Sequence, residues 1–155
     1  MNEDLVKPFW KQFVTEHPEL ANEDTPYSDE YFGDDKKTAR QFLDLVKSGD
    51  KTATCALYRM FEYYEESVPD EGSFHVITTF DGQPEAIIQV TDIDIIPFRA
   101  VPEDIAEQES GNTKDFDDWY NEYEAIFTRA MESIGETFED DLPVVCQQFK
   151  LVYKQ

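Results

Sequence analysis

Two apolar segments joined by a tight turn constrain the fold more than any other feature. Residues 73–80 and 86–90 are rich in β-branched and aromatic side chains, and Asp81-Gly82 lies between them. Asp-Gly between two such segments is a strong signal for a β-hairpin, because its turn needs residues that tolerate positive φ. The second segment continues through residues 91–95, where apolar and polar residues alternate. We therefore predict two long antiparallel strands with one buried face.

The order of the remaining elements sets the fold class. Amphipathic patterns predict helices over residues 5–20, from residue 39 to 48, from residue 102 to 110 and over 113–134. Strands are predicted after residue 51 and over residues 142–153, while residues 58–66 fit either a strand or a short helix. This order is not the regular βα alternation of a parallel sheet. It predicts an α+β fold, a small and mostly antiparallel β-barrel with helices packed across it.

Composition and charge limit the classes of partner. The 155 residues suit one domain (1–155), in which residues 1–35 form a helix and a loop packed on the barrel. Thirteen basic and 35 acidic residues give a net charge of −22. Such a surface repels polyanions, so no extended nucleic-acid footprint is expected, although one nucleoside or unstacked base still fits a local pocket.

The two cysteines and two histidines do not form a recognisable metal-binding pattern, and we expect neither a metal nor a cofactor. Cys55 and Cys146 each lie in an apolar segment without a CxxC or CxxH neighbour, so we expect buried free thiols and a reducing, cytoplasmic environment. His17 and His75 are interpreted as structural residues. No segment approaches the length of a membrane span, and the chain is expected to be a monomer or a homodimer.

The segment Gly49-Asp50-Lys51-Thr52-Ala53-Thr54 is the first candidate site. Gly49 has the position of a residue just beyond a helix C-terminus, and Thr52 and Thr54 share one face of the strand that follows. Lys51 stands where its amine can approach Thr54, and a hydroxyl beside a base is half of a nucleophile arrangement. On spacing alone, an ordinary surface lysine before strand threonines is the commoner interpretation. Glu109 ends the helix before Gly111 and is the second candidate.

Together these motifs resemble the ASCH domain family, named for activating-signal-cointegrator homology. The resemblance extends from residue 9 onward and rests on the order of Tyr31-Phe32-Gly33-Asp34, Gly49-x-Lys51-Thr52-x-Thr54, Ile96-Pro97-Phe98, Ala106-Glu107-Gln108-Glu109, Trp119, Phe127 and Pro143-Val144-Val145-Cys146-x-x-Phe149.

The resemblance implies a PUA-like β-barrel fold, and it implies either a hydrolytic or an RNA-binding function. A shorter bacterial relative is an amidohydrolase that removes the acetyl group from acetylated cytidine, and its catalytic residues match Lys51, Thr54 and Glu109. Gly49, Thr52 and Tyr58 are the expected substrate-binding residues. Another relative is reported as a ribonuclease, and the wider family is presumed to bind RNA. The alternatives are therefore a non-catalytic module for single-stranded RNA or a nucleotide, or a ribonuclease, which ranks lower because no histidine pair is visible.

Three departures from the family pattern bear on these roles. Ser110-Gly111-Asn112 stands where an acidic and glycine-containing string is usual, Tyr123 stands where a histidine is usual, and Gln147 stands where an acidic residue is usual. The resemblance therefore does not define how these positions contact substrate or move protons.

Overall fold

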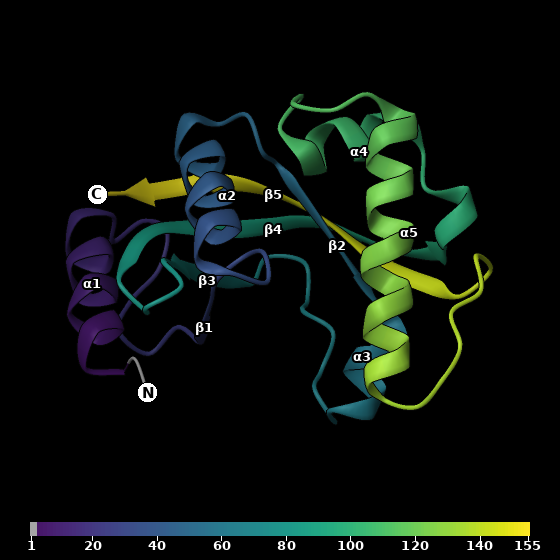
Figure 1. Ribbon diagram of the computed structural model, residues 1–155. Coiled ribbons are helices and arrows are strands. Elements are labelled where there is room, and N and C mark those ends of the chain that lie inside the picture. The colour runs from purple at the N-terminus through teal and green to yellow at the C-terminus, as the bar shows by residue number, and fades with distance from the viewer. Residues whose placement is uncertain (1–2) are drawn as a thin grey trace.

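A single five-stranded sheet forms the centre of the molecule (Figure 1). This is a computed structural model, and it describes residues 3–155. The strand order is β1 (Tyr27–Glu30), β3 (Phe74–Thr78), β4 (Pro84–Pro97), β5 (Pro143–Lys154) and β2 (Ala53–Leu57). Only the β1–β3 pair is parallel, whereas the other three pairs are antiparallel. The predicted α+β class, the hairpin at Asp81-Gly82 and the mostly antiparallel sheet are confirmed.

The predicted closed barrel is wrong, because the sheet is open. β1 and β2 lie at its two edges, and no ladder joins them within residues 3–155. The two edge strands have only 4 and 5 residues, whereas β4 and β5 have 14 and 12. A barrel needs its edge strands long and tilted enough to meet, and these are too short. β1 itself was expected to be part of a loop.

Helices cover the sheet along its length. They are α1 (Glu3–Glu16), α2 (Lys36–Ser48), α3 (Tyr58–Tyr63), α4 (Glu103–Ser110) and α5 (Phe116–Ser133), with a short 3-10 helix at Phe98–Ala100. The ambiguous segment after β2 is therefore helical. Within the described part of the chain, no helix combines the length and apolar character that a membrane crossing needs.

Three hydrophobic clusters connect these helices to the sheet. α1 packs on β3 and β4 through residues such as Trp10 and Phe13. α2 packs on β4 and β5 through Leu43 and Val46. The cluster of α4 and α5, which includes Trp119, covers β2 and β5. In Figure 1, β2 runs diagonally between α2 and α5.

Two helix ends bring the candidate residues together. α2 ends at Gly49, whose φ of 85° is the left-handed conformation predicted for it. The next residues fold back, since the backbone N–H groups of Asp50 and Lys51 both donate to the Leu45 carbonyl. The Thr52 N–H then donates to the carbonyl of Gln108 in the last turn of α4. This contact holds the start of β2 against the end of α4.

Candidate functional site

Lys51 and Glu109 form an ion pair in the interior. The Lys51 ammonium lies 3.2 Å from Glu109 Oε2, and the two residues are only 1% and 2% exposed. Lys51 Nζ also donates to the Ala53 carbonyl at 2.8 Å and to the Glu109 carbonyl at 2.6 Å. An ammonium has three hydrogens to donate, and two of them go to these carbonyls while the Glu109 carboxylate supplies the counter-charge. These contacts fix the position of the Lys51 side chain.

Two aromatic donors hold the Glu109 carboxylate. Trp119 Nε1 donates to Oε1 at 3.2 Å, and the Tyr123 hydroxyl donates to Oε2 at 2.7 Å. Burial, followed by the nearby Glu109 charge, raises the pKa of Tyr123 well above its usual value. Tyr123 is therefore a neutral donor at physiological pH. Because Trp119 and Tyr123 are one helical turn apart on α5, they fix both oxygens from the same side.

Aromatic rings also surround the lysine. The ammonium lies 4.6 Å from the ring centre of Phe42 on α2 and 5.4 Å from that of Phe32, which lies between β1 and α2. A cation over a ring face is stabilised by the ring quadrupole, most strongly where water is excluded. The charge of Lys51 is thus stabilised by two carbonyls, one carboxylate and two rings.

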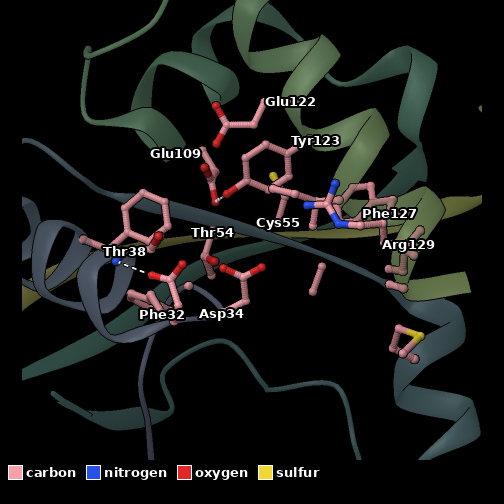
Figure 2. Close-up of a pocket in the computed structure, with 18 of the residues that line it drawn as sticks. Phe32, Asp34, Thr38, Thr54, Cys55, Glu109, Glu122, Tyr123, Phe127 and Arg129 are labelled. Carbon is pink, nitrogen blue, oxygen red and sulfur yellow. Dashed lines mark hydrogen bonds between the residues drawn. The ribbon is translucent and has the colours of Figure 1, made fainter. Parts of the chain in front are cut away.

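This pair opens onto a cavity of about 460 Å³. Thr54, from the middle of β2, stands between Glu109 and Asp34 in Figure 2. The wall is largely apolar, with aromatic side chains from three segments, and it includes Phe32, Phe42, Tyr123, Phe127, Met60 and Ile126. A concave, mainly apolar lining that also carries polar groups is typical of a small-molecule site.

The charged residues at the cavity are mostly acidic. Asp34, Asp35 and Glu122 line it beside Glu109, and among residues 3–155 its basic lining residues are Lys51 and Arg129. Glu122 is paired with Lys114 at 3.0 Å, and Asp35 caps α2 through the Thr38 N–H. Figure 2 shows the Arg129 side chain reaching from α5 toward this space.

The structure separates the predicted site residues into two groups. Lys51, Thr54 and Glu109 line the same cavity, although no hydrogen bond links Lys51 to Thr54 among the described residues. Gly49, Thr52 and Tyr58, the expected substrate-binding residues, do not line it. Gly49 terminates α2, Thr52 donates to the Gln108 side chain at 3.2 Å, and Tyr58 begins α3.

The two cysteines are free thiols at the site, and Cys55 lines the cavity whereas Cys146 does not. Cys55 is paired with Cys146 across β2 and β5, and its thiol donates to Cys146 Sγ at 3.7 Å. This hydrogen bond and burial raise the pKa of Cys55 well above its usual value, so it is a poor nucleophile. No cluster of three or more potential metal ligands occurs in residues 3–155.

The sequence predicted the helix that carries Trp119 and Tyr123 but not their role as donors to Glu109. Their spacing of four residues was the available signal, since it puts an indole N–H and a phenol on one helix face. Phe32 and Phe42 were also missed as contacts of Lys51. Their position depends on how α2 packs beside β2, which no local pattern encodes.

The comparisons with known proteins agree on one family. The sequence-family model of the ASCH domain matches residues 28–153. The ASCH domain from Lactobacillus crispatus JV V101 is 29% identical with a TM-score of 0.87, over 97% of this chain and 96% of that one. A protein from Enterococcus faecalis V583 is 31% identical with a TM-score of 0.86, over 96% and 88% of the two chains. No curated protein matches the sequence.

Proposed function

Since this chain belongs to the ASCH domain family, we propose that it is an amidohydrolase that acts on a small nucleoside-like substrate, such as acetylated cytidine. The observation that carries the proposal is the buried Lys51–Glu109 pair, which opens onto a cavity shared with Thr54. The activity of a shorter family relative, implied by the matching motif, gives the reaction class.

The energetics of the ion pair support a functional role. Removing two charges from water costs several kcal/mol per ion, and the mutual attraction often only offsets this cost. A buried pair is therefore weak as a stabilising device. A charged pair at the floor of an apolar cavity is, by contrast, an arrangement common in active sites.

The lining of the cavity supports a flat, uncharged ligand. Phe32, Phe42, Tyr123 and Phe127 offer ring faces and edges on which a base can stack. The acidic residues at the cavity and the net charge of −22 oppose a polyanion. A single nucleoside therefore fits better than a long nucleic-acid strand.

In this proposal, Thr54 Oγ attacks the acyl carbon of the substrate amide. The hydroxyl proton passes to Lys51 Nζ and then to the leaving amine, and water hydrolyses the acyl-enzyme to release the acid. Lys51 must first give up a proton and turn away from one of its present acceptors. Glu109, held by Trp119 and Tyr123, keeps the lysine in position and is placed to activate the water.

The test is the turnover of acetylated cytidine by the wild type and by Thr54→Ala. Loss of a nucleophile or its base should lower kcat by a factor on the order of 10²–10⁴ or more. Thr54→Ser should keep measurable activity, because it retains the hydroxyl. Thr15→Ala, an exposed threonine on α1, is the matched control and should equal the wild type. Turnover by Thr54→Ala at the wild-type rate would refute the mechanism.

A non-catalytic binding module is the second candidate, and one observation favours it. The Lys51 ammonium already donates to two buried carbonyls and is paired with the Glu109 carboxylate, which suits a fixed positive charge better than a base. On this alternative, the cavity binds a nucleotide or one base of single-stranded RNA without turnover. Binding of cytidine together with no hydrolysis of acetylated cytidine would select it.

A further inference from the structure

A second cavity, of about 740 Å³, adjoins the first. Thr54 and Ala56 line both cavities, so the middle of β2 is their common wall. The other walls come from β1, the segment 66–70, the start of β3 and Gln147 on β5. A ligand held at Thr54 therefore has room in two directions, and the proposed reaction uses only the first.

Gln147 is a buried polar residue of this cavity whose side chain lacks a partner within the described part of the protein. It lies directly opposite Thr54 in the β2–β5 register and is only 8% exposed. Its side-chain amide forms no hydrogen bond with any residue from 3 to 155, and its nitrogen and oxygen are not among the fully enclosed atoms, so they remain open to a ligand that can match them. Because Gln147 lines the cavity, its free donors and acceptor face the space beside the candidate nucleophile.

The neighbouring His75 differs from Gln147, because both nitrogens of its imidazole already have partners in the protein. His75 Nδ1 lies 2.7 Å from Ser28 Oγ and 3.3 Å from Glu30 Oε2, and Nε2 lies 3.0 Å from Ser73 Oγ. Both ring nitrogens therefore have partners within the protein. Gln147, by contrast, keeps its donors and its acceptor available for a ligand.

The charges around this cavity select against phosphate. Asp29, Glu30, Glu66 and Asp70 line it, and its lining contains no lysine or arginine. Carboxylates accept hydrogen bonds from hydroxyl groups but repel a phosphate dianion, which proteins normally bind through arginine, lysine or backbone N–H groups. An amide with both donors and an acceptor matches hydroxyl groups in the same way.

We propose that the second cavity is a subsite for a neutral, hydroxyl-bearing sugar, with Gln147 as its main hydrogen-bonding residue. The sugar belongs to the ligand whose flat ring occupies the first cavity. The identity of that ring as a pyrimidine base rests on the proposed function. The subsite makes the protein specific for a free nucleoside, because a phosphorylated sugar would enter the acidic cavity with two negative charges.

The experiment compares the binding of three probes by calorimetry at fixed ionic strength: cytosine, cytidine and cytidine 5′-monophosphate. Wild type should bind cytidine at least severalfold more tightly than cytosine, and the monophosphate more weakly than cytidine. Gln147→Leu should weaken cytidine binding about three- to tenfold, the range for one lost hydrogen bond, and leave cytosine binding unchanged. Gln83→Leu, at an exposed turn residue outside both cavities, is the matched control.

Several results would overturn the subsite. These are equal affinities of wild type for cytosine and cytidine, tighter binding of the monophosphate than of cytidine, or no binding of any probe. More than tenfold tighter binding of 5′-amino-5′-deoxycytidine would replace the sugar site by a cation site. The wild-type series decides the question even if Gln147→Leu does not fold. A sugar-dependent affinity without hydrolysis would retain the subsite and refute only the enzyme.

Discussion

Replacing Lys51 by methionine tests whether the ion pair has the buried geometry described here. The substitution keeps an unbranched side chain of similar length but leaves the Glu109 carboxylate buried without a counter-charge. It also removes the donor from the carbonyls of Ala53 and Glu109. Breaking a buried pair at one partner costs about 3–5 kcal/mol. For a chain of this size, that loss corresponds to a decrease in Tm of roughly 6–20 °C.

Urea denaturation followed by tryptophan fluorescence measures this loss, and a double mutant makes the interpretation specific. Glu109→Gln removes the charge that Lys51→Met leaves unpaired, so the double mutant should be more stable than Lys51→Met alone by at least about 1 kcal/mol. Lys7→Met, at an exposed lysine on α1, is the control and should lie within about 0.5 kcal/mol of the wild type. A small effect of Lys51→Met, equal to that of the control, would refute the buried pair.

Three further substitutions test other parts of the structure. Tyr123→Phe removes a donor from the buried Glu109 carboxylate and should cost about 1.5–3 kcal/mol in denaturant unfolding. Gly33→Ala places a Cβ 2.8 Å from Thr38 Cγ2, whereas Gly72→Ala at a similar positive φ meets nothing within 4 Å. The first should therefore be less stable than the second by about 1–3 kcal/mol. Hydrogen bonds from an arginine and a lysine lower the pKa of Glu85 from 4.5 to about 2. The wild type should thus lose this stabilisation as the pH falls from about 5 to about 2, and Glu85→Gln should lack that part of the pH dependence. An unchanged pH profile in Glu85→Gln would contradict the assignment.

The parts of the fold that sequence predicted correctly are those fixed by local chemistry. The Asp81-Gly82 turn, the end of α2 at Gly49 and the end of α4 at Gly111 each depend on backbone conformations that few residues adopt. The strand β1 was missed, because its sequence Tyr-Ser-Asp-Glu is polar and its parallel pairing with β3 is a distant contact. The prediction of a closed barrel was wrong for the same reason. Closure would need pairing between β1 and β2, two short edge strands that are distant in sequence.

Of the six predicted site residues, Lys51, Thr54 and Glu109 line one cavity, whereas Gly49, Thr52 and Tyr58 do not. Lys51 and Glu109 were both identified, and the fold brings their side chains together. The amine was expected to approach Thr54, but its nearest acceptors are two carbonyls and the Glu109 carboxylate. The α4–β2 packing that creates these contacts joins segments far apart in sequence. No spacing rule along the chain reveals it.

The most direct test of the account follows the two tryptophan indole N–H signals by NMR during a cytidine titration. Trp119 Nε1 donates to Glu109 at the cavity, whereas Trp10 lies in the α1 cluster and its buried Nε1 has no partner within residues 3–155. One signal therefore reports the site and the other is an internal control. We predict that the Trp119 signal shifts and saturates while the Trp10 signal stays fixed. A Trp119 signal that does not move at millimolar cytidine, or that moves only together with Trp10, would contradict the assignment of this cavity as a nucleoside site.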